Sequence, residues 1–210
     1  MFPKKAEELE LAGELADNEV VSEKEQGFLQ KTGWFVLELI KLAIIAGLTI
    51  GLVRYFLFKP FYVRGQSMEP NFEEKDYLII DELTYRFRGP ERGEVVVFKA
   101  PVNNGDYYLK RIVGLPGERV RIADNKVIVY NQQNPQGIVV EENYLSMETA
   151  GAITQQLGVD EYFVLGDNRN ASYDSRRFGP IKTRDIVGRT WLRGWPLTRL
   201  SKFSAPAYNL

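Results

Sequence analysis

The pattern of apolar and polar residues divides the chain into three parts. Residues 1–33 are polar and acidic, which predicts a flexible arm with a short helical stretch over 6–17. Residues 34–58 are almost continuously apolar, which predicts one transmembrane helix. Residues 59–210 contain short apolar runs separated by glycine and proline, which predicts one β-rich domain.

The apolar segment 34–58 is long enough to span a membrane. At about 1.5 Å per residue it would extend roughly 37 Å as a helix, against a hydrocarbon core of about 30 Å. Glu38 and Lys41 interrupt its first half, but their spacing lets them pair on one helix face. Trp34 and Tyr55 suit the membrane interface. A buried helix of a soluble domain and a cleaved signal peptide are alternatives, and basic residues on both sides leave the orientation open.

The remaining sequence has the pattern of many short strands. The predicted strands are 61–64, 77–80, 94–98, 107–113, 119–122, 126–130, 161–165, 185–188 and 190–193. Ala123-Asp124-Asn125 marks a hairpin turn between two of them. These features predict an all-β sandwich or partly closed barrel. Residues 131–160 show no clear pattern, and 145–158 is interpreted as a surface excursion.

Composition narrows the possible chemistry. The chain has no histidine and no cysteine, which excludes Ser-His-Asp and Cys-His catalysis and zinc sites built from those residues. A hydroxyl is then the plausible nucleophile, and a lysine amine is the best remaining base. The formal net charge of −1 gives no indication of nucleic-acid binding.

Ser67 is a candidate nucleophile. It follows a predicted strand and lies between Gly65 and Pro70. Gly65 lets a backbone approach closely, and Pro70 disfavours further strand hydrogen bonding. A serine in such a turn is more often structural.

Lys110 is the candidate base, because it interrupts an otherwise apolar strand. Holding a lysine neutral at pH 7 costs about 4.6 kcal/mol, which burial can supply. The alternative is a lysine that protects an edge strand from aggregation.

A third polar segment, Gly166–Arg176, follows an apolar strand. Ser172 or Ser175 could orient a lysine base without adding charge, and Asp174 could pair with Arg176. The alternative is a hydrophilic loop held by local turns.

Together these segments resemble the type I (leader) signal peptidases. GQSMEP resembles the nucleophile segment of that family and YLKRIVGLPGE its base segment. GEVVVFKAP resembles its core strand, and GDNRNASYDSRRFGP its C-terminal signature. Four motifs in the family's order make the resemblance specific, and it extends from the apolar span to about Trp195.

The resemblance implies roles for individual residues. Ser67 would be the nucleophile, Lys110 the general base and Ser172 the residue that orients it. Asp174 and Arg176 would form a structural ion pair. Some family members carry a serine that donates to the oxyanion where this chain has Gly65, so the backbone N–H of Ser67 would serve instead. Val63, Gly65 and Met68 would line the substrate cleft, and no metal or cofactor would be required.

The resemblance also implies a setting. The substrates would be preproteins, cut after small residues of the Ala-x-Ala type and bound as an added strand. The partners would be the lipid bilayer and, by proximity, the translocation machinery. The arm would be cytoplasmic or stromal, and the β domain would lie on the periplasmic, extracytoplasmic or thylakoid-lumenal side.

Two other functions are compatible with parts of the pattern. A self-cleaving repressor-type Ser-Lys protease carries a DNA-binding module where this chain has its apolar span. A membrane-tethered β adaptor that binds extended peptides would need neither a buried lysine nor a serine at a strand end.

Overall fold

The computed structural model describes residues 33–51, 58–102, 105–145 and 147–209. It separates into two units, residues 1–52 and 53–210, which are described one at a time. In the first, Gly33–Gly51 forms a helix that is long and apolar enough to cross a membrane. Trp34, Leu42 and Leu48 are exposed along it, and Glu38 lies 3.8 Å from Lys41. The predicted arm lies outside the described residues as far as Thr32. Phe58, the last residue of the predicted span, belongs to a strand.

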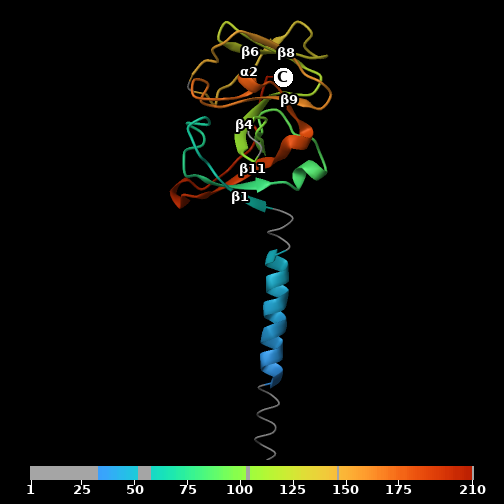
Figure 1. The fold of residues 1–210 in the computed structure, drawn as a ribbon, viewed down its shortest axis with the longest axis vertical. Coiled ribbons are helices and arrows are strands. Elements are labelled where there is room, and N and C mark those ends of the chain that lie inside the picture. Colours follow the sequence, from blue (N-terminus) through green and yellow to red (C-terminus); the bar gives the residue numbers. More distant parts are fainter. Residues whose placement is uncertain (1–32, 52–57, 103–104, 146, 210) are drawn as a thin grey trace, which may run out of the picture. The chain divides into compact units, whose positions relative to one another are not determined.

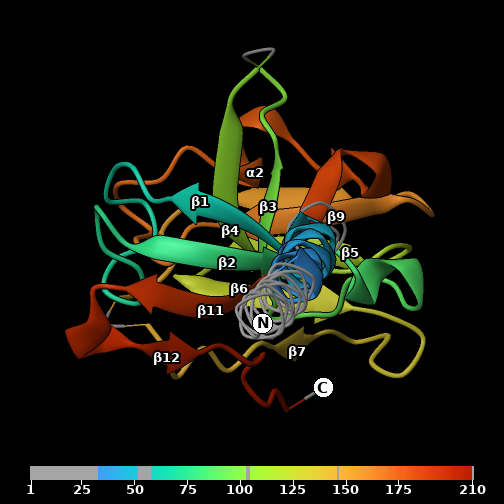
Figure 2. The same ribbon diagram turned by 90° about the horizontal axis from the view of Figure 1, so that it is seen from below.

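The second unit contains two antiparallel sheets (Figure 1). The larger sheet has the order β1-β2-β11-β3-β4-β9-β10, with β12 paired to β11. Its strands are β1 (Phe58–Tyr62), β2 (Tyr77–Asp81), β3 (Val95–Lys99), β4 (Tyr107–Gly114), β9 (Glu161–Leu165), β10 (Ile181–Lys182), β11 (Ile186–Trp195) and β12 (Ser201–Lys202). Figure 2 shows β1, β2 and β11 side by side at one end of this sheet.

The smaller sheet has the order β7-β6-β5-β8. It consists of β5 (Arg119–Ala123), β6 (Lys126–Tyr130), β7 (Ile138–Val139) and β8 (Ile153–Gln156). The predicted hairpin turn joins β5 to β6 through Asp124 and Asn125, which both adopt positive φ. Among the described residues of this unit, the helical elements are a short helix, α2 (Ser175–Phe178), and 3-10 turns at Thr84–Arg86, Thr183–Asp185 and Leu197–Arg199. The mainly β prediction is confirmed, and of its two alternatives, sandwich and partly closed barrel, the barrel is not formed, because the strand order closes neither sheet among the described residues.

Three apolar clusters hold this unit together. The first lies between the sheets, where Val113 and Phe163 of the larger sheet meet Val120 and Val129 of the smaller one. The second packs the loop after β1 onto β2 and β3. The third includes Phe98 and covers the part of the larger sheet near α2. The second cluster determines where Ser67 lies.

The predicted strands differ from the observed ones in two places. One strand, β11, replaces the predicted pair 185–188 and 190–193. The predicted gap at Arg189 is not a break, because Arg189 pairs with Asp81 of β2. A Cβ on the preceding residue, Gly188, would lie 2.6 Å from the carbonyl oxygen of Asp81, so glycine permits this close strand pairing. In addition, β8 lies in the segment predicted to be a surface excursion, where Ile153 pairs with Ile122.

Candidate active site

Ser67 lies in a loop that leaves β1 and returns to β2. Val63 and Asp76 close this loop through a backbone bond of 2.9 Å, and the buried side chains of Met68 and Phe72 anchor it to the sheet. Gly65 has a φ of +82°, and nothing lies within 4 Å of a Cβ built there. The expected close approach at Gly65 was therefore wrong, and the glycine is needed for its backbone conformation.

Lys110 lies in the interior of the larger sheet. Its strand β4 pairs with β3 on one side and β9 on the other, so the edge-strand alternative is wrong. The side chain is buried, and its Nζ lies 2.8 Å from Ser67 Oγ. The same amine donates a 2.9 Å hydrogen bond to the Leu109 carbonyl. The structure thus brings together two residues that are 43 positions apart in the sequence.

Burial changes the protonation of Lys110. Desolvation lowers its pKa from 10.5 to about 8, although the negative charges of Asp174 and Asp167 act in the opposite direction. With a pKa near 8, about one molecule in ten carries the neutral amine at pH 7. A neutral amine has a lone pair that can accept the hydroxyl proton of Ser67.

Ser172 and Ser175 lie in different environments. Ser175 accepts a 2.9 Å hydrogen bond from the backbone of Val164, so its hydroxyl is used in holding β9. Ser172 Oγ is buried and makes no hydrogen bond of normal geometry with the described residues. Its hydroxyl is nevertheless close enough to Asp174 to contribute to the lowered pKa of that carboxyl group. A Cβ on Gly166 would lie 2.2 Å from Ser172 Oγ and 2.5 Å from the Ser67 carbonyl oxygen. Gly166 therefore lets Ser172 lie beside the Ser67 backbone.

Asp174 and Arg176 form the predicted ion pair. Arg176 donates to the two carboxylate oxygens through its Nε and one terminal nitrogen, each at 2.8 Å. Burial acts to raise the pKa of Asp174, but its bonds to Arg176 and Gly166 overcome this effect and hold the pKa below its usual value. Asp174 also caps α2 by accepting from the Arg176 backbone. The pair fixes the segment that carries Ser172.

An apolar cleft of about 370 Å³ opens over Ser67 and Lys110. Val63, Gly65 and Met68, the three predicted cleft residues, all contribute to its lining. Leu78, Val97 and Leu109 add further apolar surface, and Tyr107, Tyr108 and Tyr173 add aromatic side chains. The cleft is therefore suited to an extended peptide segment with small or apolar side chains.

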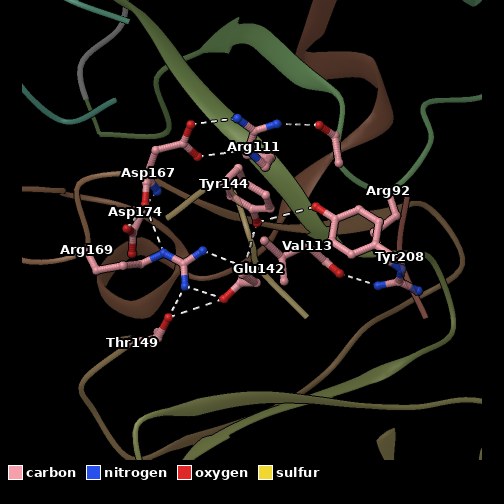
Figure 3. Close-up of polar contacts among 12 residues, drawn as sticks. Arg92, Arg111, Val113, Glu142, Tyr144, Thr149, Asp167, Arg169, Asp174 and Tyr208 are labelled. Atoms are coloured by element: carbon pink, nitrogen blue, oxygen red, sulfur yellow. Dashed lines mark hydrogen bonds and ion pairs between the residues drawn. The ribbon is translucent and has the colours of Figure 1, made fainter. Parts of the chain in front are cut away.

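Two buried ion pairs near the site were not predicted (Figure 3). Arg111 binds both carboxylate oxygens of Asp167, at 2.9 and 2.6 Å, and Arg169 binds Glu142 in the same way, at 2.5 and 2.7 Å. Arg169 Nε also donates to the Gly166 carbonyl at 3.0 Å. The backbone N–H of Asn168, between the two paired residues, donates to the Ser67 carbonyl at 3.1 Å. These pairs therefore hold the chain that contacts Ser67.

A sequence signal existed for only part of this network. Arg111 is a second charge in an apolar strand, and Asp167 and Arg169 belong to a polar segment already identified. Glu142 lies in a region without any recognisable pattern. Among the described residues no acidic, histidine or cysteine cluster could hold a metal ion.

Comparisons with known proteins identify the family of the chain. The model of the family "Signal peptidase, peptidase S26" matches residues 36–195. A probable signal peptidase I-2 of Synechocystis sp. is 38% identical over 172 residues, covering 78% of this chain and 75% of the relative. A signal peptidase I of Leptolyngbya laminosa is 34% identical over 179 residues, covering 81% and 83%. The crystal structure of a signal peptidase I from Enterococcus faecalis is similar with a TM-score of 0.43 and 29% identity, covering 49% of this chain and 97% of that one. The family model matches most of the chain, and the Synechocystis and Leptolyngbya relatives are similar over most of both chains. The chain therefore belongs to the signal peptidase family, peptidase S26.

Proposed function

We propose that this chain is a membrane-anchored serine endopeptidase that removes signal peptides from translocated preproteins, with Ser67 as nucleophile and neutral Lys110 as general base. The observation that carries the proposal is the 2.8 Å contact between Lys110 Nζ and Ser67 Oγ in a buried setting. Family membership supports the reaction, and the cleft beside Ser67 supports a peptide substrate.

The proposed reaction proceeds in two stages. Lys110 takes the proton of Ser67 as Oγ attacks the scissile carbonyl, and the resulting ammonium then protonates the departing amine. The released amine is the new N-terminus of the mature protein, and the signal peptide remains as an ester on Ser67. Lys110 next activates a water molecule, which hydrolyses that ester and restores both groups.

The surrounding residues support these steps. The Leu109 carbonyl accepts one amine hydrogen of Lys110, which helps to direct the lone pair toward Ser67. We assign Ser172 as a second acceptor that orients the amine, because its buried hydroxyl makes no hydrogen bond of normal geometry among the described residues. The backbone N–H of Ser67 would donate to the oxyanion, because Gly65 offers no hydroxyl.

The helix Gly33–Gly51 would anchor the enzyme in the bilayer as a single span. The domain order would then be an acidic arm over 1–33, a span that begins at 34 and a peptidase domain from about 59 to 210. In the proposed topology the arm faces the cytoplasm or stroma, and the peptidase domain faces the periplasm, extracytoplasmic space or thylakoid lumen. There it would meet preproteins leaving the translocation machinery, with small residues of the Ala-x-Ala type fitting the cleft.

Preprotein cleavage by full-length protein in detergent tests the proposal. Wild type should release the mature protein, while Ser67→Ala and Lys110→Met should not, although Ser67→Ala should still bind the preprotein. A peptide-binding adaptor would bind equally well in all three forms and cleave in none. Undiminished cleavage by Ser67→Ala would refute the assigned nucleophile.

A further inference from the structure

Residues 203–209 form a strap that connects the two sheets. At one end Phe203 donates to the Trp191 carbonyl at 2.9 Å and stacks on Phe72 with 4.4 Å between ring centroids. At the other end Asn209 donates to the Val139 carbonyl at 3.0 Å and accepts from the Glu141 backbone at 3.3 Å. Figure 2 shows this segment running from β12 toward β7.

Tyr208 is the central contact of the strap. Its ring occupies the space that a side chain at Gly93 would fill, since a Cβ there would lie 2.6 Å from a ring carbon of Tyr208. Its hydroxyl lies 3.3 Å from the hydroxyl of Tyr144 (Figure 3). The Tyr144 ring in turn lies 4.1 Å from the Arg111 guanidinium, and the Gly93 carbonyl accepts from Arg111 at 2.8 Å. The strap therefore reaches Arg111 by two routes.

Arg111 connects these contacts to the nucleophile. Its guanidinium holds both oxygens of Asp167, and the next residue, Asn168, donates its backbone N–H to the Ser67 carbonyl. The attraction within a buried ion pair offsets the cost of desolvation only while its geometry is good. Loss of the Tyr208 ring would admit water beside Arg111 and loosen the segment that supports Ser67.

We propose that Tyr208 is a positioning residue for the reaction, which acts through Tyr144, Gly93 and Arg111 on the segment Asp167–Asn168 that holds Ser67. This inference rests on the proposed role of Ser67. It assigns a function to a strap whose residues 203–209 are not among those lining the catalytic cleft.

The chain offers a matched control. Tyr130 also packs its ring against a positive-φ glycine, Gly137, and has the Arg119 guanidinium 4.1 Å from its centroid. It lies on β6 of the smaller sheet, and these partners, Gly137 and Arg119, belong to none of the contacts that join Tyr208 to Ser67 through Arg111. Tyr130→Ala therefore makes the same chemical change as Tyr208→Ala without disturbing the path through Arg111.

The test measures steady-state preprotein cleavage and amide exchange in the full chain in detergent, well below the unfolding temperature. Tyr208→Ala should lower kcat roughly tenfold with KM within about twofold, because the reacting groups are displaced while the cleft is intact. Its Asn168 amide should exchange faster than in wild type. Tyr208→Phe should restore kcat to within about twofold, because the ring contact with Gly93 is retained, and Tyr130→Ala should keep kcat and the Asn168 exchange rate.

Other results would overturn the proposal. A wild-type kcat in Tyr208→Ala, or an equal loss in Tyr130→Ala, would reduce the strap to a general stabilising element. If Tyr208→Ala does not fold, Tyr208→Leu replaces it in the test, because leucine retains apolar bulk. A full kcat in Tyr208→Leu would then contradict the proposal. Ser67→Ala is measured alongside. If Ser67→Ala is inactive while Tyr208→Ala keeps the wild-type kcat, only the positioning role of the strap is refuted. If Ser67→Ala is active, the proposed nucleophile is refuted.

Discussion

Lys110 and Arg111 are adjacent on β4, but they make contacts in two separate environments. The Lys110 amine reaches Ser67 in the cleft, and the Arg111 guanidinium binds Asp167 and the Gly93 carbonyl outside it. Successive side chains of a strand point to opposite faces, so one strand supplies both the proposed base and the support for the nucleophile loop. The order of these two cations is therefore essential to the site.

The pH dependence of cleavage should follow the deprotonation of Lys110. Its pKa is lowered to about 8 by burial, so the neutral fraction rises about tenfold between pH 7 and pH 9. We expect kcat/KM to rise by this factor, with a slope of one below pH 8. A pH series on a preprotein substrate checks this expectation, and a flat profile across that range would contradict the assignment of the base.

Asp174→Asn should shift that profile to lower pH. The Asp174 carboxylate raises the pKa of Lys110, and its removal leaves Arg176 as an uncompensated positive charge nearby. The variant should also lose about 3 kcal/mol of stability, because Asp174 is fully buried and pairs with Arg176. Cleavage profiles and urea unfolding measure the two effects, and an alkaline shift would show that another charge controls Lys110.

Lys110→Met should be inactive but more stable than wild type at pH 7. The pKa of Lys110 is about 8 in the folded chain and about 10.4 when unfolded, so its burial costs about 3 kcal/mol at any pH below 8. The wild type recovers this free energy as pH rises from 8 to 10.4. Allowing for lost hydrogen bonds, the variant should gain about 2 kcal/mol at pH 7.

Thermal unfolding in detergent at pH 7 and pH 10 checks this prediction. The advantage of Lys110→Met should shrink at the higher pH. If the variant is less stable than wild type at pH 7, then burial of Lys110 does not lower the stability of the folded chain.

Gly65→Ala should impair both stability and activity. Space is available for the methyl group, but the φ of +82° costs a residue other than glycine about 1–2 kcal/mol. Relief of that strain would shift Ser67, two residues later. Gly117→Ala is the matched control, since Gly117 has a φ of +79° with open space and lies in the turn after β4. It should lose similar stability in urea unfolding and keep full cleavage, and equal activity in both variants would argue against the role of the Gly65 turn.

The sequence predicts the proposed reacting pair better than the residues that support it. Lys110 stands out because a lysine is unusual in an apolar strand, whereas Ser67 becomes a strong candidate only through the family motifs that accompany it. Glu142, Tyr144 and Tyr208 lie in loops without periodicity, so their contacts depend on how distant segments meet. Two errors in the strand prediction also depend on how distant segments meet. Arg189, left between two predicted strands, pairs with Asp81, and Ile153, in the predicted surface excursion, pairs with Ile122.

The proposed role of Lys110 as a neutral base is tested most directly by an NMR titration of its amine in the full-length protein in detergent micelles. Selective isotope labelling, with Lys110→Met to assign the signal, follows the chemical shift next to Nζ from pH 6 to pH 12. We expect a midpoint near 8, produced by burial beside Ser67. A midpoint near the ordinary lysine value of 10.5 would contradict it, because too little neutral amine would then exist to activate Ser67 at neutral pH.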